Sequence, residues 1–237
     1  MRNFDENSIT NAVIARVGSA SDRRTRQLSA ALVKHLHAFI KEIEPTEAEW
    51  QSGIGFLTEV GAKCSPTRQE FILLSDTLGV SMLVDAINHR NPGGATDTTV
   101  LGPFYVEDPP VMPLGADISA GESGVPLLVE GTVRGFDGAP LANATVDTWH
   151  SDTEGYYDVQ KADAPMRLRA RFKTEAGGRF AFRTIVPSYY PIPTDGPVGR
   201  MLAAQGRHPY RPAHIHFMIS APGHRTLVTH VFIAGDP

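Results

Sequence analysis

Apolar residues in the first third of the chain recur at the spacing of an amphipathic helix. Between residues 22 and 89 they return every three or four positions, which places them on one face of a helix. The clearest run of such positions is Leu28, Leu32, Leu36, Phe39, Ile40 and Ile43. Two Thr-x-x-Glu sequences, at 46–49 and 67–70, have the spacing of capping boxes. The pattern predicts successive helices that end at the Asn-Pro-Gly-Gly turn of residues 91–94.

After about residue 125 the pattern changes to alternation of apolar and polar positions. Short runs rich in Val, Ile, Thr and Phe are separated by Gly, Pro and Asp, as expected of strands joined by turns. These runs are residues 125–136, 143–150, 167–173, 178–185, 213–220 and 226–233. Their spacing favours a β-sandwich over a sheet with crossover helices. We therefore predict an α+β fold that is mainly β, with a helical region at 1–97, a connector at 98–124 and an antiparallel β-sandwich at 125–237.

Composition narrows the class of protein. Against 26 Asp and Glu the chain has 22 Lys and Arg, a net charge of −4, so no basic field favours binding to nucleic acid. The single cysteine, Cys64, excludes an internal disulfide, a four-cysteine zinc site and a cysteine-ligated iron–sulfur cluster. No run of about 18 apolar residues occurs, so membrane insertion is not expected. The charged N-terminus lacks the apolar run of a signal peptide, and we expect a cytoplasmic protein.

Two histidines separated by one residue form a candidate metal half-site. His214 and His216 lie in a predicted strand, where residues two apart point to the same face. Neutral imidazole nitrogens are common ligands of transition metals. Buried histidines that are satisfied by hydrogen bonds would show the same pattern. Spacing alone leaves both interpretations open.

Two tyrosine pairs could supply oxygen ligands to the same ion. Tyr156-Tyr157 follows the strand that ends at His150, and Tyr189-Tyr190 precedes a Pro-rich stretch. A phenol ionises near pH 10 in water, so it binds as phenolate only beside a strongly acidic cation. Hard phenolate oxygens favour iron(III) over zinc or copper(I). Taken alone, each pair is explained equally well by aromatic packing.

Four segments together resemble the intradiol ring-cleavage dioxygenases, which are non-haem iron(III) enzymes that act on catechol-type substrates. The segments are LGPFY (101–105), DTWHSDTEGYYD (147–158), VPSYYPIPTDGPVG (186–199) and RPAHIHF (211–217). They occur in the family's order, and the resemblance covers essentially the whole chain. It implies a homodimer formed through the N-terminal helices, an interface that holds lipid in some relatives.

The resemblance implies a role for each residue that matches a family motif. The implied metal ligands are Tyr157, Tyr190, His214 and His216. Arg211 would stabilise negative charge on the bound ring, and Tyr190 would also act as base for a substrate hydroxyl proton. Tyr156 and Tyr189 are left for packing or the pocket wall. The implied substrate-binding residues are Leu78, Ser81, Val100, Leu101, Gly102, Pro103, Phe104 and His230.

The implied reaction is cleavage of an aromatic ring between adjacent hydroxyls, with both atoms of O₂ inserted and Fe(3+) as cofactor. GYYDVQ, TVLGPFY, EFILLSD and THVF are closer to the hydroxyquinol (benzene-1,2,4-triol) branch than to the catechol branch. Hydroxyquinol is therefore the expected substrate and a hydroxymuconate or maleylacetate the product, with catechol or chlorocatechol as the alternative. Ser81 is the candidate partner of the third hydroxyl.

Two other classes of protein fit parts of the pattern. A non-catalytic β-sandwich that binds small aromatics would use the tyrosine-rich segments, but it has no reason to carry both histidines and Arg211 as well. A zinc hydrolase would need a carboxylate or third histidine at motif spacing. Relatives continue for some tens of residues beyond the position of Pro237, so we also expect a shortened C-terminus.

Overall fold

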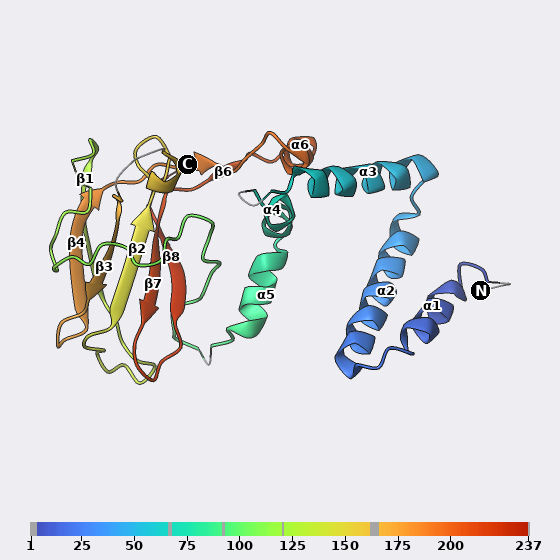
Figure 1. Cartoon of the computed structure of the whole chain (residues 1–237), viewed down its shortest axis with the longest axis horizontal. Helices are drawn as coiled ribbons and strands as arrows, with labels where there is room; N and C mark the ends of the chain where they lie inside the picture. Colours follow the sequence, from blue (N-terminus) through green and yellow to red (C-terminus); the bar gives the residue numbers. More distant parts are fainter. Residues whose placement is uncertain (1–3, 66–67, 92, 120, 162–165, 237) are drawn as a thin grey trace. The chain divides into compact units, whose positions relative to one another are not determined.

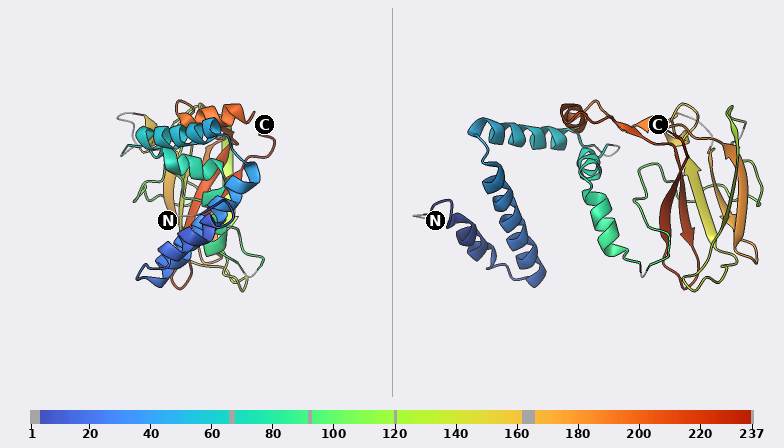
Figure 2. Two further views of the ribbon diagram at one scale, coloured as in Figure 1. Left: turned by 90° about the vertical axis from the view of Figure 1, so that its right-hand side faces the viewer. Right: turned by 180° about the vertical axis from the view of Figure 1, so that it is seen from behind.

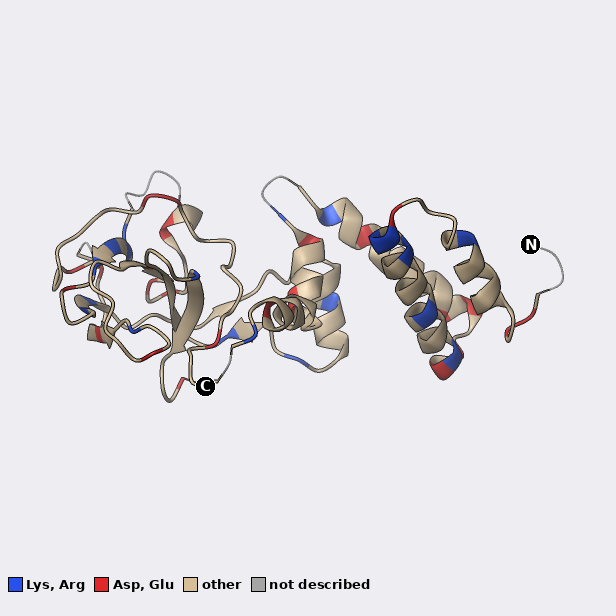
Figure 3. Cartoon of the chain, turned by 90° about the horizontal axis from the view of Figure 1, so that it is seen from below, with Lys and Arg blue, Asp and Glu red and all other residues tan. Residues whose placement is uncertain are grey.

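The computed structural model describes residues 4–65, 68–91, 93–119, 121–161 and 166–236 (Figure 1). The chain divides into two compact units, Met1–Glu59 and Val60–Pro237. Acidic and basic residues occur in both units (Figure 3). None of the described helices is long and apolar enough to cross a membrane. The functional division into a dimerisation region, a connector and a catalytic sandwich stays a prediction.

Among the described residues, five helices precede the strands, and four of them lie where the helical period predicts helices. They are α1 (Ile9–Val17), α2 (Arg23–Ile43), α3 (Glu47–Lys63), α4 (Glu70–Thr77) and α5 (Val80–Asn88). The pattern did not predict α1, which lies beside α2 (Figure 2). The capping box predicted at 46–49 is confirmed, because Glu49 Oε2 accepts from Thr46 N at 2.8 Å and Thr46 Oγ1 accepts from Glu49 N at 3.3 Å.

The apolar stripe of α2 lies on the surface of the first unit. Its six predicted members are between 39% and 67% exposed: Leu28, Leu32, Leu36, Phe39, Ile40 and Ile43. An amphipathic helix ordinarily buries such a face against a neighbour. A contiguous exposed apolar surface of this kind is typical of an association site.

The second unit contains the predicted antiparallel β-sandwich. One sheet pairs β1 (Pro126–Thr132) with β4 (Arg179–Ile185). The other has the order β3 (Arg169–Lys173), β2 (Thr145–His150), β7 (His214–Ser220) and β8 (Leu227–Phe232). A separate ladder pairs β5 (Tyr190–Pro191) with β6 (Tyr210–Arg211), two short strands that the pattern did not predict. The α+β fold class and the six longer strands are confirmed.

Alternation gives the four-stranded sheet two chemically different faces. The face toward β1 and β4 is apolar, and there Phe172 of β3 stacks on Phe182 of β4 with ring centroids 5.3 Å apart. Residues two apart share a face, so the intervening positions of β2, β3 and β7 point to the opposite side. These include Trp149, Arg169 and His216. The residues able to do chemistry therefore lie on the outer face of the sheet, away from the sandwich core.

A titratable residue in the sandwich interior, His150, predicts a pH dependence of stability. His150 lies between the sheets, with Nε2 2.7 Å from Thr184 Oγ1 and Nδ1 2.7 Å from Ser151 O. Burial lowers its pKa from 6.5 to about 4. Above pH 6.5 neither state binds this proton. Below it only the unfolded state does, so the free energy of unfolding falls as the pH drops toward 4.

We expect His150→Gln to reduce this loss of stability. Between about pH 7.5 and 4.5 the drop in unfolding free energy should be smaller than in wild type by about 2–3 kcal/mol. Urea unfolding at the two pH values measures it. The exposed His208 offers a matched control, since His208→Gln should keep the wild-type drop. An equal drop in His150→Gln and wild type would contradict the assignment.

The capping box predicted at 67–70 stays untested. Thr67 lies outside the described residues, and α4 begins at Glu70 itself with Gln69 as N-cap, so Glu70 is not in the third helical position. Its fully buried carboxylate instead accepts from Val198 N at 3.2 Å, in the first turn of α6 (Pro197–Ala204). Gly196 allows this approach, because a Cβ there would lie 2.3 Å from Glu70 Oε1. Glu70 thus anchors the excursion between β5 and β6.

Candidate functional site

The two histidines of β7 direct their Nε2 nitrogens toward one point. His214 and His216 lie two positions apart on the same face of the strand. Each is 1% exposed, and their Nε2 atoms are 3.2 Å apart. His214 Nδ1 lies 2.7 Å from the carbonyl oxygen of Pro212, which holds the ring proton on Nδ1 and leaves a lone pair on Nε2. Burial lowers the pKa of His214 to about 4 and lowers that of His216 as well. Both rings are therefore neutral near pH 7, which is the ligating form.

One tyrosine of each pair lies against these histidines. Tyr157 Oη is 3.1 Å from His216 Nε2, and the Tyr157 and Tyr190 rings meet edge to face at 5.5 Å. Tyr157 is 0% and Tyr190 7% exposed, whereas their neighbours Tyr156 and Tyr189 are 51% and 44% exposed. Burial raises the pKa of Tyr157, so its ionisation needs a nearby cation.

A glycine allows the Tyr157 loop to approach β5. Gly155 has φ +86, and a Cβ there would lie 2.8 Å from Tyr190 Cβ. A side chain at this position would push the loop away from the strand. Glycine is therefore required on steric grounds at the first position of the Gly-Tyr-Tyr sequence, because only glycine lets Tyr157 and Tyr190 come into contact.

Arg211 reaches the second tyrosine through the short β5–β6 ladder. The register places Tyr190 opposite Arg211, and Arg211 Nη1 donates a hydrogen bond to Tyr190 Oη at 2.8 Å. A charged donor therefore lies beside the phenol oxygen. The position suits stabilisation of negative charge at that oxygen or on a molecule next to it.

The connector and β8 bring three of the predicted substrate-binding residues to the same place. Phe104 stacks on Tyr157 with centroids 4.3 Å apart, and Gly102 (φ +78) passes so close that a Cβ would lie 3.3 Å from His216 Cε1. His230 faces His216 across the β7–β8 ladder at 4.1 Å between ring centroids, with its Nε2 buried and without a hydrogen-bond partner. Together with His214 and His216 it forms a cluster whose ring nitrogens lie within 4.8 Å of one another.

The remaining substrate-binding candidates come from the connector and from the helices before it. Val100, Leu101 and Pro103 belong to the same connector as Phe104, and the backbone of Val100 hydrogen-bonds His230. Leu78 is 54% exposed at the end of α4, and Ser81 on α5 hydrogen-bonds Ser75 at 2.8 Å. Among the described residues, no hydrogen bond, ion pair or ring contact joins these two to the tyrosines or histidines of the site. Their role as a pocket wall stays a prediction.

Comparison with known proteins gives the family. The family described as "Dioxygenase" matches residues 100–237, and "Catechol dioxygenase N terminus" matches residues 22–96. The 6-chlorohydroxyquinol 1,2-dioxygenase of Cupriavidus pinatubonensis is 53% identical over 100% of this chain and 86% of its own length. The chain belongs to the intradiol ring-cleavage dioxygenase family.

Two further relatives agree with this assignment. The hydroxyquinol 1,2-dioxygenase of a Rhizobium species is 52% identical to this dioxygenase over 99% of the chain and 80% of its own length. The solved structure of hydroxyquinol 1,2-dioxygenase from Pseudomonas putida DLL-E4 has a TM-score of 0.95 and 50% identity, covering 98% of this chain and 82% of that one. These matches are to enzymes, and they give no support to an aromatic-binding module or a zinc hydrolase.

Sequence reasoning missed several residues that surround the donors of this dioxygenase. Trp149 stacks on His216 with centroids 4.6 Å apart and an interplanar angle of 13°. Asp158 and Arg169 form a buried ion pair immediately behind Tyr157. A signal for Trp149 and Arg169 was present, because both occupy the polar side of alternating strands, where a large aromatic or a buried arginine is unusual.

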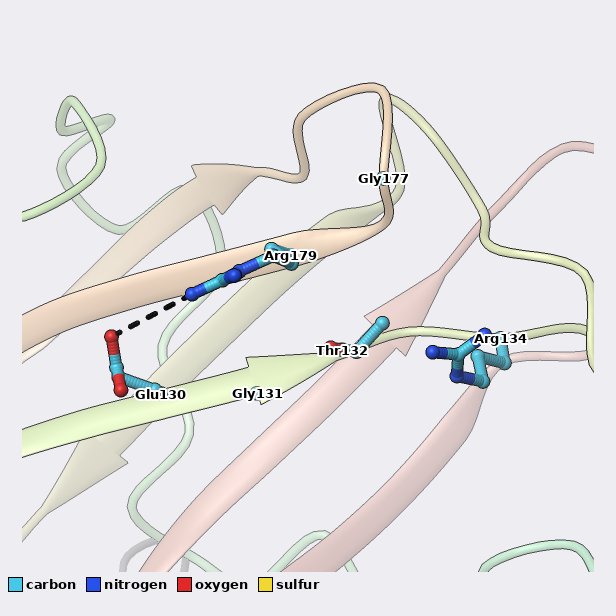
Figure 4. Close-up of a pocket in the computed structure, with 6 residues that line it drawn as sticks. All are labelled: Glu130, Gly131, Thr132, Arg134, Gly177 and Arg179. Carbon is cyan, nitrogen blue, oxygen red and sulfur yellow. Dashed lines mark ion pairs between the residues drawn. The ribbon is translucent and has the colours of Figure 1, made fainter.

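A surface hollow elsewhere on the dioxygenase contains none of the predicted site residues. It is lined by Glu130, Gly131, Thr132, Arg134, Gly177 and Arg179 (Figure 4). Glu130 and Arg179 lie 4.0 Å apart across β1 and β4, and both are more than half exposed. An exposed ion pair of this kind contributes little to stability.

Proposed function

We propose that this dioxygenase holds iron(III) and uses O₂ to cleave hydroxyquinol between two adjacent hydroxyls, giving a hydroxymuconate or its keto form, maleylacetate. The observation that carries the proposal is the convergence of four buried donors, Tyr157, Tyr190, His214 and His216. Relatives named for hydroxyquinol and about half identical to this chain support the substrate class. Catechol or chlorocatechol is the alternative substrate.

The donor set fits a ferric ion chemically. His214 and His216 supply neutral nitrogens, because burial lowers the pKa of both. Burial raises the pKa of Tyr157, so its oxygen becomes a phenolate only with a compensating positive charge, which a trivalent cation provides. When bound, a ferric ion would make the hydroxyls of a catechol-type substrate acidic, and the deprotonated ring would be electron-rich enough to react with O₂.

In this proposal Tyr190 is the proton acceptor, and Arg211 stabilises the negative charge that develops on the substrate. In our proposal Tyr190 Oη accepts the proton of one substrate hydroxyl. Arg211 Nη1 already donates to that oxygen at 2.8 Å, so its positive charge lies where the substrate becomes negative. Phe104 and Trp149 stack on Tyr157 and His216 and keep water away from the donor atoms. The lower dielectric that results strengthens the effect of Arg211.

Ser81 is the proposed partner of the third hydroxyl of hydroxyquinol. It lies on α5 and already hydrogen-bonds Ser75 at 2.8 Å. We expect Ser81→Ala to lower kcat/KM for hydroxyquinol by about 10-fold or more and to leave catechol turnover within about 2-fold, since losing the partner of a buried hydroxyl affects only the substrate that has it. Ser75→Ala serves as the control for loss of the Ser75–Ser81 bond. Equal effects of Ser81→Ala on both substrates would remove Ser81 from specificity.

The exposed stripe of α2 supports association of two copies through the N-terminal helices. Its apolar side chains, such as Leu32 at 67% exposure, are more open to water than is usual on a monomer. We propose that a second chain covers this stripe. An acyl chain of a lipid held at the same surface would be compatible with its apolar character.

A visible absorption spectrum tests the iron and the ring-cleaving activity together. Iron(III)-phenolate coordination produces a charge-transfer band, and hydroxyquinol added without oxygen should shift that band. Admitting O₂ should then yield a ring-opened product detectable by mass spectrometry. A colourless protein after loading with iron would contradict the ligand set. A higher kcat/KM for catechol than for hydroxyquinol would assign the alternative substrate.

A further inference from the structure

A row of four side chains crosses the outer face of the four-stranded sheet. The strand register pairs Arg169 with Trp149, Trp149 with His216, and His216 with His230. Three of them are aromatic rings that stack on or face one another. The fourth, Arg169, is only 2% exposed. Burying a guanidinium costs free energy unless hydrogen-bond partners compensate its charge. The hydrogen bonds of Arg169 therefore show which segments it joins.

Arg169 donates hydrogen bonds to two separate segments of the chain. Nε and Nη2 donate to the two carboxylate oxygens of Asp158, with Nε 2.7 Å from Oδ2. Nη1 donates to the carbonyl oxygen of Phe104 at 3.1 Å. Asp158 begins the short 3₁₀ helix η1 (Asp158–Gln160) after β2, and Phe104 lies in the connector that precedes β1. One side chain therefore joins segments more than 50 positions apart in the sequence.

Both partners of Arg169 are in contact with Tyr157. Asp158 follows Tyr157 directly in the chain, and the Phe104 ring stacks on the Tyr157 ring at 4.3 Å with an interplanar angle of 20°. The carboxylate of Asp158 also accepts from the backbone N–H of Val159 at 2.9 Å and of Arg167 at 3.2 Å, which holds the loop. Arg169 thereby restrains the backbone of Tyr157 through Asp158 and its ring through Phe104.

We propose that Arg169 is a positioning residue, which holds the Tyr157 phenol at the metal site by tying the Tyr157 loop to the connector. The proposal rests on the proposed function, in which Tyr157 is an iron ligand. A planar guanidinium can serve a carboxylate and a carbonyl at once, whereas a lysine ammonium provides the same charge without the fork. Arg169→Lys therefore keeps the charge and removes the tie.

Arg171 provides a matched control on the same strand and face. It donates to Asp147 with bonds of 2.7 and 2.8 Å and to Asp108 at 3.1 Å, so it also joins a sheet carboxylate to the connector. Both carboxylates are buried, with Asp147 1% and Asp158 7% exposed, whereas the side chain of Arg171 is 25% exposed and that of Arg169 2%. Neither Asp147 nor Asp108 is adjacent to Tyr157 in the chain. Arg171→Lys thus removes the fork of a half-buried guanidinium from a buried carboxylate that is not next to Tyr157 in the chain.

The first test needs no metal. Tetranitromethane is added to the iron-free chain of 237 residues, and nitrated tyrosines are located by fragment mass spectrometry. Tyr157, at 0% exposure, should be protected in wild type and in Arg171→Lys, and nitrated at least about 5-fold faster in Arg169→Lys because the restraint on its ring is lost. Tyr156, at 51% exposure, reports equal reagent access in all three proteins.

The second test measures iron affinity by competition with EDTA. Loss of a residue that orients a metal ligand typically lowers metal affinity about 10–100-fold. We expect that loss in Arg169→Lys and a change of less than about 3-fold in Arg171→Lys. Thermal unfolding of both iron-free variants measures their stability. It shows whether the difference in iron affinity between them is larger than a difference in stability explains. Should Arg169→Lys fail to fold, Asp158→Asn with Asp147→Asn as its control gives the same comparison.

The outcomes separate this proposal from the proposed function. The positioning role stands if protection of Tyr157 and iron affinity both fall in Arg169→Lys and neither falls in Arg171→Lys. Equal behaviour of the two variants in either test overturns it. A wild-type protein that binds no iron would instead overturn the proposed function, and the nitration result would still decide whether Arg169 restrains Tyr157.

Discussion

Alanine at His216 is expected to leave the protein without bound iron and more than about 100-fold less active, because even residues that only orient a ligand contribute 10–100-fold. His216 Nε2 lies within 3.2 Å of His214 Nε2 and 3.1 Å of Tyr157 Oη, so its removal opens the centre of the donor set. Iron content per chain, measured by inductively coupled plasma mass spectrometry after dialysis against EDTA, checks the expectation. The visible charge-transfer band should disappear with the iron.

The exposed His224 supplies the control for this substitution. His224→Ala removes an imidazole in the turn after β7, ten residues beyond His214, and should keep both iron and activity. Tyr157→Phe should behave like His216→Ala, since it deletes a phenol oxygen and leaves the ring stacked on Phe104. Stoichiometric iron in either His216→Ala or Tyr157→Phe would contradict the ligand assignment.

Arg211→Ala is expected to keep its iron and its colour and to lose about 100- to 1000-fold in kcat, which is the usual effect of removing one donor that stabilises developing charge. Arg211 Nη1 donates a hydrogen bond to Tyr190 Oη at 2.8 Å, and Arg211 is not itself one of the four proposed iron ligands. Steady-state kinetics with hydroxyquinol and an iron assay on the same sample measure both effects. Arg211→Lys should recover part of the lost rate because it restores the charge.

Arg179→Ala, at an arginine 66% exposed on β4, controls for loss of a positive charge in general. It should leave kcat within about 2-fold of wild type, because exposed ion pairs contribute little. An unchanged kcat in Arg211→Ala would mean that Arg211 acts only in the fold. Loss of iron in the same variant would instead mean that its bond to Tyr190 holds a ligand in place.

Period and spacing were sufficient to predict most of the fold. The change from a helical repeat to alternation separates the helices from the six longer strands, because side-chain direction repeats at 3.6 residues in one and at two in the other. Elements without a periodic pattern were missed. β5 and β6 have two residues each, and α6 occurs in a Pro- and Gly-containing stretch where Glu70, distant in the sequence, accepts from its first turn.

The sequence by itself determined that His214 and His216 share one face of a strand, since alternation requires it whatever surrounds the strand. It also supplied two tyrosine pairs and the family motifs. The choice of Tyr157 and Tyr190 over Tyr156 and Tyr189 rested on the resemblance, and the tertiary structure gives it a physical basis. Which neighbour of a pair is buried depends on how the segment of Tyr157 meets β5, a long-range contact that the tyrosine pairs do not specify.

Only the tertiary structure decided which residues support the site. Trp149 against His216, and Arg169 between Asp158 and Phe104, are contacts between segments far apart in the chain. Local pattern carries no information about such partners, because strand order and register determine them. Short sequence motifs thus determine which side chains can act as metal donors. Their positions depend on long-range packing across the outer face of the four-stranded sheet.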